Sequence, residues 1–329
     1  MDHAMTAVPE SVLVVGSGSI ARRHIRNLLA LGASRVDVVT RRNVAGEDPF
    51  SDSRVHVLPE TPDTHVAVAV VATATDTHLA TARGLVAAGT HVLIEKPLAA
   101  AVTPDLQLLA DEAEARGTVV RVAYNMRLLP VIERVKALVA DGAIGRPLFA
   151  RIEVGQWLPD WRPERDYRES YSVSAERGGG VALDLSHEVD YMMFLFGRPE
   201  NWTVRHAKTG LLDLDCEDVF EGIYLYPMGF TCSVHLDYLE RTPRRRMRVV
   251  GSTGEIECDI VGRRLTVRRG SATEISESPE MFDMSATYPA ELEAFLGAVH
   301  GEPTNLATLD DGREVLRLLA DPGEADCDV

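Results

Sequence analysis

The first third of the chain alternates short apolar runs with longer stretches of helical character. Buried strands are predicted where Val, Leu, Ile and Ala follow one another, at residues 11–15, 35–40, 66–72, 91–94 and 119–123. Helices are expected between them at residues 20–31, 77–88 and 104–116, each with a glycine after its last turn. Strands that alternate with helices predict a doubly wound parallel sheet, so residues 1–123 are expected to form a Rossmann dinucleotide-binding domain of the α/β class.

The pattern changes after about residue 124. Helices are predicted at residues 130–140, 181–196, 289–300 and 308–319, and extended segments at 147–154, 202–206, 219–226, 231–239, 247–250, 255–259 and 264–268. Strands that follow one another without helices between them indicate a mostly antiparallel, open sheet. Residues 124–320 are therefore expected to form an α+β domain for substrate binding and oligomerisation, its final helices being free to pack back on the Rossmann domain. The acidic tail at 321–329 is expected to be disordered.

Composition narrows the classes of partner. A chain of 329 residues suits two domains, and its net charge of −16 disfavours nucleic acid and anionic membranes as partners. The opening residues lack the pattern of a secretory signal, and no apolar run approaches the ~20 residues of a membrane span, so a cytoplasmic protein is expected. Four widely spaced cysteines without a CxxC pair predict no metal site and no disulfide framework.

A glycine-rich turn follows the first predicted strand and opens the first predicted helix. It reads Gly16-Ser17-Gly18-Ser19-Ile20-Ala21. Glycines let the backbone turn tightly and approach a pyrophosphate, a small residue such as Ala21 lets the helix pack on the strand, and the helix N-terminus offers N–H groups to the phosphates. Gly16, Gly18, Ser19, Ile20 and Ala21 are therefore predicted to bind a dinucleotide; the alternative is a turn of small residues without a ligand.

The end of the second predicted strand indicates which nicotinamide cofactor is preferred. NAD sites usually place a carboxylate there to accept from the ribose 2′-hydroxyl. This chain instead reads Val38-Val39-Thr40-Arg41-Arg42-Asn43, with two guanidinium groups suited to a 2′-phosphate. Arg41 and Arg42 therefore favour NADP over NAD, with ordinary surface arginines as the alternative.

Two further motifs carry a family resemblance. Glu95-Lys96-Pro97 follows the apolar run 91–94, and three glycines at 178–180 precede the phrase Asp184-Leu185-Ser186-His187-Glu188-Val189-Asp190. Together with the glycine turn, in this order, they resemble the glucose–fructose oxidoreductase/inositol dehydrogenase/MocA (Gfo/Idh/MocA) family over about residues 11–319. Residues 18–24 and 184–191 are similar to the branch of that family associated with surface carbohydrate and nucleotide-sugar metabolism.

The resemblance implies roles for three residues. Lys96 corresponds to the lysine that lies between nicotinamide and substrate, where an ammonium stabilises a developing alkoxide, with Glu95 beside it on the cofactor side. His187 corresponds to the general acid/base and Asp184 to its supporting carboxylate; an imidazole suits this exchange near neutral pH. Pro97 is expected to follow a cis bond.

A continuous helix over 181–196 would place Asp184, His187, Glu188 and Tyr191 on one face. The Asp–His spacing is three residues, whereas the commoner family pattern has four. Glu188, Asp190 or a water therefore remain alternatives for orienting the imidazole, and a plain helix-surface pair is the alternative to a catalytic one.

Other candidates follow from position. Thr73 and Thr75 end the strand at 66–72, where the family lines the nicotinamide ribose. His78 opens the next helix, where packing or capping is an equal alternative.

Substrate contacts are predicted at three places: for Tyr124, Asn125 and Arg127 after the last Rossmann strand, for Trp161, Arg162 and Tyr167 in a loop rich in Trp and Arg, and for Tyr191. That loop has a dimer contact or a lid as its alternative, and the arginines at 241–248 are expected on a solvated hairpin flank.

The resemblance implies a reversible NAD(P)-dependent alcohol–ketone conversion on a carbohydrate or nucleotide-sugar-like substrate by a homodimer or homotetramer. Two relatives' activities are alternatives on the same fold: a glycoside hydrolase that uses tightly held NAD, and a non-catalytic cofactor sensor. The presence of Lys96, Asp184 and His187 disfavours the sensor.

Overall fold

The computed structural model describes residues 9–62, 66–161 and 163–322, which form two compact units. The first unit contains the chain up to Leu128 and Ser285–Arg313, and the second contains Leu129–Met284 and the chain from Glu314 onward. Arg162 and most of the predicted disordered tail lie outside the described residues. Among the residues described, no helix combines the length and apolar character needed to cross a membrane.

A six-stranded parallel sheet forms the centre of the first unit, as the strand–helix alternation predicts. Its order is β3-β2-β1-β4-β5-β6. The strands are β1 (Ser11–Val15), β2 (Arg35–Val39), β3 (Val55–Leu58), β4 (Val68–Val71), β5 (His91–Ile94) and β6 (Val120–Val122). The order reverses between β1 and β4, and in open sheets of this kind ligands bind at the carboxyl ends of the strands beside such a switch point.

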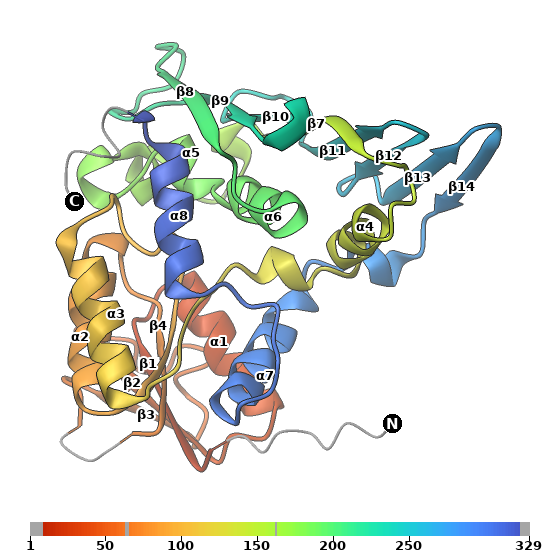
Figure 1. Ribbon diagram of the computed structural model, residues 1–329. Helices are drawn as coiled ribbons and strands as arrows, with labels where there is room; N and C mark the ends of the chain where they lie inside the picture. The colour runs from red at the N-terminus through yellow and green to blue at the C-terminus, as the bar shows by residue number, and fades with distance from the viewer. Residues whose placement is uncertain (1–8, 63–65, 162, 323–329) are drawn as a thin grey trace. The chain divides into compact units, whose positions relative to one another are not determined.

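Helices cover both faces of this sheet. They are α1 (Ser19–Ala30), α2 (His78–Ala87), α3 (Pro104–Arg116), α7 (Thr287–Val299) and the start of α8 (Leu309–Leu319). Helices α2 and α3 lie on one face and α1 and α7 on the other (Figure 1). Leu292, Phe295 and Leu296 of α7 are almost fully buried in the same core as Ile25 and Leu28 of α1. The first unit therefore acquires part of its core from a segment more than 150 residues further along the chain.

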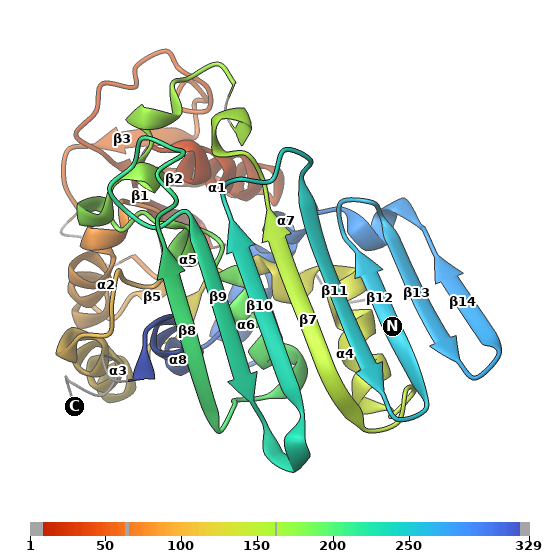
Figure 2. The same cartoon turned by 90° about the horizontal axis from the view of Figure 1, so that it is seen from above.

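An eight-stranded, mostly antiparallel sheet forms the second unit, in the order β14-β13-β12-β11-β7-β10-β9-β8. The strands are β7 (Pro147–Gly155), β8 (Asn201–Ala207), β9 (Val219–Leu225), β10 (Thr231–Asp237), β11 (Arg244–Gly251), β12 (Gly254–Asp259), β13 (Arg264–Arg269) and β14 (Ala272–Ser276). One face is open, and helices α4 (Pro130–Ala140) and α6 (His187–Phe196) lie behind the other (Figure 2). The predicted combination of a Rossmann unit and an α+β unit with an open sheet is confirmed.

Two edge strands were not predicted. In β3, His56 and Val57 are exposed, and every residue of β14 except the last is exposed. An edge strand is paired on one side only and buries little apolar surface, so its sequence carries a weak alternation signal.

The predicted continuous helix over 181–196 was wrong. The chain forms a short helix, α5 (Val181–Asp184), then leaves helical geometry at Leu185 (φ −102°, ψ 24°) and restarts at His187 as α6. Ser186, at the N-cap position of α6, has near-helical angles (φ −61°, ψ −13°) and makes no side-chain cap hydrogen bond. Because apolar residues continue across the break, periodicity did not reveal it. Asp184 and His187 therefore lie on either side of a helix break. They do not share one face of a continuous helix with Glu188 and Tyr191.

The arginine-rich run leads into a hairpin, as predicted. Strand β11 forms an antiparallel hairpin with β12 and pairs with β7 on its other side. Arg244, Arg246 and Arg248 are exposed on the open face, whereas Met247 and Val249 are buried. This period of two is that of a half-buried strand.

Candidate active site

The glycine turn of the first unit has the geometry of a phosphate-binding turn. Gly16 has φ +124°, and a Cβ there would lie 2.2 Å from the carbonyl oxygen of Ala72, so no other residue fits beside the end of β4. Gly18 has an ordinary φ of −69°, and a Cβ there would meet no atom within 4 Å. Neither strain nor packing within the unit requires a glycine at this position, so the open space above it is available to a ligand.

Helix α1 begins directly at this turn and presents its positive end there. Its N-cap, Gly18, has no side chain to cap the first N–H groups, and the first turn carries no acidic residue. Ala21 is fully buried, which lets the helix lie close to the sheet. Unsatisfied N–H groups and the helix dipole together favour an anion such as a pyrophosphate.

The end of β2 is tied to the glycine turn through two hydroxyls. The Oγ atom of Ser17 lies 2.8 Å from Oγ1 of Thr40, which also accepts from the backbone N–H of Arg42 at 3.2 Å. The side chains of Arg41 and Arg42 are exposed just beyond it. Asp37, the one acidic residue of β2, accepts from Ser11 and Arg35 inside the unit and stands three residues before Thr40. The strand therefore ends in a hydroxyl and two guanidinium groups.

Two buried histidines hold the Glu95-Lys96-Pro97 turn, which follows β5 directly and contains a cis Lys96–Pro97 bond, as the resemblance implies. The Nε2 atom of His24 lies 2.7 Å from Oε1 of Glu95, and Oε2 of Glu95 accepts from the backbone N–H of Lys96 at 3.2 Å. Helix α1 therefore supports this turn through the hydrogen bond between His24 and Glu95.

His78, the second of these histidines, faces two backbone carbonyls. Its Nδ1 lies 3.0 Å from the oxygen of Pro97 and its Nε2 lies 3.2 Å from that of Thr73. Burial lowers the pKa of His78, so the neutral ring donates through one nitrogen only. His78 therefore connects the turns that follow β4 and β5, and its ring is almost fully buried.

The threonines after β4 differ in exposure. Thr73 is half-buried and its Oγ1 accepts from Thr77 at 2.8 Å, whereas Thr75 is buried at the start of a short helical turn. Both stand at the carboxyl end of β4, next to the glycine turn that contacts Ala72.

The segment after β6 is buried within the first unit. Tyr124, Asn125 and Arg127 are between 0% and 5% exposed. Asn125 donates to Oγ1 of Thr287 at 2.7 Å, and Arg127 pairs with Asp311 at 3.2 Å. These contacts fix the chain against α7 and the start of α8; contact with a substrate stays a prediction for the three residues.

The helix break of the second unit carries the predicted acid/base pair. Asp184 is 4% exposed, and its Oδ2 accepts from the hydroxyl of Tyr238 at 2.7 Å. Burial and the charge of Asp184 raise the pKa of Tyr238 well above its ordinary value, so Tyr238 remains a donor. The edge of Trp161 packs against Tyr238, with ring centroids 5.4 Å apart, and half-buried His187 begins α6. Tyr238, which directly follows β10 and belongs to no motif, was not predicted.

Glu188 is held in a buried ion pair. Its two oxygens accept from Nε and Nη2 of Arg245 at 2.7 and 3.2 Å, and Oε1 also accepts from the hydroxyl of Tyr191 at 3.3 Å. Both Glu188 and Tyr191 are fully buried. Breaking such a pair is strongly destabilising, so Glu188 is committed to Arg245. Asp184 and Asp190 are therefore the better candidates to support the imidazole of His187.

The aromatic and basic loop before the three glycines makes one ion pair within itself and further contacts with later segments of the second unit. The hydroxyl of Tyr167 accepts from the backbone N–H of Asp213 at 3.1 Å, and Arg168 pairs with Asp166. The guanidinium of Arg241 stacks 3.5 Å from the ring centroid of Trp157. Arg162 lies outside the described residues, so its predicted substrate contact stays a prediction.

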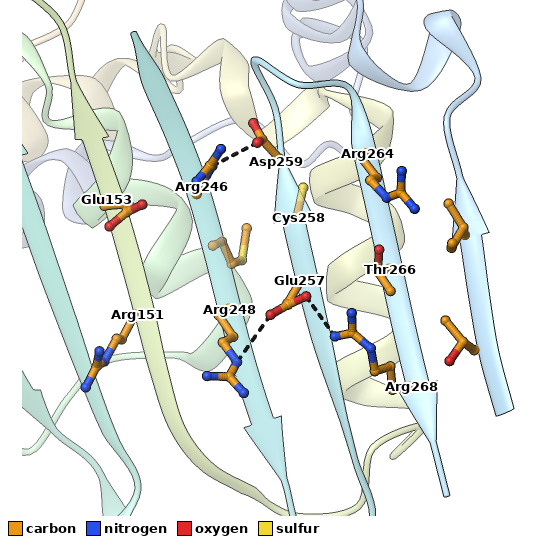
Figure 3. A pocket seen from close by; sticks show the side chains of 13 residues that line it. Arg151, Glu153, Arg246, Arg248, Glu257, Cys258, Asp259, Arg264, Thr266 and Arg268 are labelled. Carbon is orange, nitrogen blue, oxygen red and sulfur yellow. Dashed lines mark hydrogen bonds and ion pairs between the residues drawn. The ribbon is translucent and has the colours of Figure 1, made fainter. Parts of the chain in front are cut away.

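A hollow on the open face of the second sheet contains none of the predicted site residues (Figure 3). Arginine and carboxylate side chains alternate across it and pair with one another, as in Arg246–Asp259 at 2.8 Å and Arg268–Glu257 at 2.7 Å. Five arginines and three carboxylates line the hollow, so its lining carries a net positive charge.

These features define a nicotinamide-dependent oxidoreductase with a separate second domain. Residues 11–124 match the family model "Oxidoreductase family, NAD-binding Rossmann fold", and residues 132–257 match "GFO/IDH/MocA C-terminal domain". The chain belongs to the Gfo/Idh/MocA family of oxidoreductases.

Individual relatives are named for sugar chemistry. The chain is 26% identical over 220 residues to 1,5-anhydro-D-fructose reductase of Ensifer adhaerens, a match that covers 63% of this chain and 62% of that protein. Among solved structures, the WlbA dehydrogenase from Bordetella pertussis in complex with NADH and UDP-GlcNAcA is similar with a TM-score of 0.81 and 19% identity, over 94% of this chain and 93% of that one. UDP-N-acetylglucosamine 3-dehydrogenase GnnA from Acidithiobacillus ferrooxidans has a TM-score of 0.76 and 21% identity, over 94% and 95%. At these identities the solved structures are informative about the fold alone.

Proposed function

We propose that this protein transfers hydride between a nicotinamide cofactor and a CH–OH group of a sugar or nucleotide-sugar-like substrate. One observation carries the proposal. The space above Gly18 at the start of α1 and the supported Glu95-Lys96-Pro97 turn belong to the same carboxyl edge of the parallel sheet. A phosphate-binding turn and a fixed lysine at one sheet edge suit a dinucleotide whose reactive end lies beside an ammonium.

The proposed cofactor site uses groups at three strand ends. Gly16, Gly18 and the first residues of α1 would hold the pyrophosphate, Arg41 and Arg42 the 2′-phosphate, and Thr73 and Thr75 the nicotinamide ribose. When bound, the cofactor supplies the hydride acceptor or donor. The side chain of Lys96 would hydrogen-bond the substrate hydroxyl and stabilise negative charge on its oxygen.

The proton of that hydroxyl is assigned to His187. Asp184 would support the charged imidazole, and Tyr238, which donates to Asp184, would keep this carboxylate oriented. Incubation with 1,5-anhydrofructose, levoglucosan and UDP-N-acetylglucosamine, followed by reduced-nicotinamide absorbance, tests the activity. Turnover of at least one of these classes is expected, and bound cofactor without any absorbance change across the panel would count against the proposal.

The cofactor preference gives a first prediction. Replacing Arg41 and Arg42 together by alanine should weaken NADPH binding by roughly 10- to 100-fold and change NADH binding by less than about threefold, because charge-assisted hydrogen bonds reach only a 2′-phosphate. Fluorescence titration of both cofactors measures this, with exposed Arg151 on the second sheet replaced as the control. Equal losses for NADPH and NADH would refute the assignment.

The open face of the second sheet is proposed to join copies of this chain in a homodimer or homotetramer. Leu225, Ile223 and Phe149 are exposed there beside the alternating arginines and carboxylates described above. Two copies related by a two-fold axis can oppose arginines with carboxylates while covering the apolar side chains.

A second prediction tests this interface. Ile223→Lys should reduce the assembled fraction at least about tenfold, because a buried unpaired ammonium is costly. Light scattering coupled to size exclusion measures the mass, and Leu108→Lys, on α3, is the matched control because the two side chains have similar exposure, 46% and 45%. An unchanged mass for Ile223→Lys would exclude this part of the face as the interface.

A further inference from the structure

Three ionisable side chains meet in the interior of the first unit. His24 comes from α1, Glu95 from the turn after β5 and Glu291 from α7, and they are 0%, 7% and 1% exposed. Their imidazole nitrogen and carboxylate oxygens all lie within 4.8 Å of one another. Neither His24 nor Glu291 has a part in the reaction proposed above.

Glu95 is the central member of this cluster. One of its oxygens faces Nε2 of His24 at 2.7 Å, and the other accepts from the backbone N–H of Lys96 at 3.2 Å. The carboxylate therefore connects helix α1 to the backbone of the residue that carries the ammonium. A displacement of Glu95 would be transmitted directly to the peptide unit before Lys96.

Glu291 stands beside this bridge without an ion-pair partner. Its Oε1 and the Nδ1 of His24 are both buried and have no hydrogen-bond partner among the described residues. Two neighbouring buried carboxylates cannot both ionise without a strong penalty. Burial, and then the charge of Glu95, raises the pKa of Glu291 well above its ordinary value, so Glu291 keeps its proton.

Other charged groups also face the cluster. His78 of α2 interacts electrostatically with Glu95, and Lys96 follows Glu95 in the turn. Between α1 and α7, the guanidinium of Arg23 lies 4.2 Å from the ring centroid of Tyr288. The cluster is thus built from α1, α7 and the turn after β5, and the nearest further titratable group that acts on Glu95 is His78 of α2.

We propose that His24, Glu95 and Glu291 form a proton-sharing cluster that fixes the backbone of Lys96, which makes His24 and Glu291 positioning residues. The proposal rests on the function proposed for Lys96. A neutral Glu291 leaves Glu95 as the single carboxylate charge, and that charge holds both the imidazole of His24 and the Lys96 N–H. Ionisation of Glu291 would repel Glu95 and loosen this hold.

The pH dependence of stability tests the protonation of Glu291 without reference to activity. A carboxyl whose folded pKa is raised binds its proton more tightly when folded, so its presence lowers stability progressively as pH rises above the unfolded value of 4.5. Glu291→Gln keeps the shape and neutral charge but does not titrate. The melting temperature of this variant relative to the wild type should therefore increase from about pH 5 to about pH 8.

Glu112→Gln is the matched control in the same unit. Its hydrogen bond with Arg83 lowers the pKa of Glu112, so the stability that Glu112 contributes is fully present above its unfolded pKa of 4.5 and is lost only below it. The melting temperature of Glu112→Gln relative to the wild type should therefore stay constant from about pH 5 to about pH 8. A carboxylic-acid carbonyl band in the infrared spectrum at neutral pH, absent from Glu291→Gln, is the second expected result. A destabilised Glu291→Gln together with one equivalent of divalent metal in the purified protein would overturn the proposal in favour of a cation site.

Kinetics test the positioning role. His24→Leu should lower kcat by about 10- to 100-fold while NAD(P)H affinity changes by less than about threefold, and His24→Gln, which retains a donor, should recover most of the loss. Unchanged kcat in His24→Leu would overturn positioning. If Lys96→Ala is itself fully active, the function proposed for Lys96 fails. The pH dependence of the melting temperature of Glu291→Gln still shows whether Glu291 keeps its proton in the folded protein.

Discussion

Replacing Lys96 with alanine is expected to lower kcat by roughly 10²- to 10⁴-fold, with the affinity for NAD(P)H within about tenfold of the wild-type value. The loss is large because an ammonium beside the substrate oxygen acts mainly when that oxygen gains negative charge. The backbone of Lys96 is held by Glu95, and this contact does not depend on the lysine side chain. The fold of the turn should therefore survive the substitution.

Single-turnover and steady-state kinetics measure the effect of Lys96→Ala, and cofactor titration shows whether binding is retained. Lys208→Ala is the control, because this lysine is exposed and follows β8 in the second unit. Full activity of Lys96→Ala would remove this residue from the mechanism. A proportional loss of cofactor affinity and kcat would instead indicate a role in binding alone.

Replacing His187 with alanine should lower kcat by about 10²- to 10⁴-fold and remove the pH dependence of kcat near neutrality. The imidazole begins α6 directly after the helix break, three residues beyond Asp184. Without it, no side chain of this pair is able to accept the hydroxyl proton and release it again at neutral pH.

The matched variant for this test is His187→Asn, which keeps a polar side chain of similar size without a titrating group. Both variants should lose the same step in the pH profile of kcat, and cofactor affinity should remain within about tenfold. Retention of the wild-type profile in either variant would show that another group handles the proton. Tyr238→Phe, which removes the donor to Asp184, should then show whether the Asp184 carboxylate contributes to the pH-dependent step.

The strands buried on both faces of the Rossmann sheet were predictable because nearly every residue in them is apolar. Burial in β1 and β4 is complete or nearly so, whereas β3 and β14 lie at sheet edges and carry exposed side chains. The break between α5 and α6 escaped prediction because the apolar period is the same on both sides of Leu185. Local hydrophobic patterns report burial, but they do not report a short interruption of backbone hydrogen bonding.

The arginines of β11 illustrate a second limit of sequence reasoning. By composition, the arginines between 241 and 248 all resemble a solvated segment, but in β11 only Arg244, Arg246 and Arg248 are exposed, whereas Arg245 is half-buried. Arg245 is balanced by Glu188, which lies 57 residues earlier. Only the three-dimensional pairing reveals that Arg245 is half-buried and compensates the buried charge of Glu188.

The turns that carry a motif could be located from the sequence, whereas single residues outside a motif could not. The glycine turn and the Glu95-Lys96-Pro97 turn are contiguous, and each has a local physical reason for its residues. Tyr238 and Glu291 are single residues that reach Asp184 and Glu95 through the topology of each unit. Their roles depend on contacts across 54 and 196 positions, which no local pattern encodes.

The central claim is hydride transfer between a nicotinamide cofactor and a sugar carbon. Its most direct test is incubation of the protein with NADPH or NADH deuterated at C4 and a keto-sugar or keto-nucleotide-sugar, followed by mass spectrometry of the product. Hydride transfer predicts one deuterium on the carbon that carries the new hydroxyl, with incorporation roughly 10²- to 10⁴-fold slower when Lys96→Ala is used. A product formed by bond hydrolysis, without deuterium and with NAD retained on the protein, would contradict the claim and indicate a glycoside hydrolase.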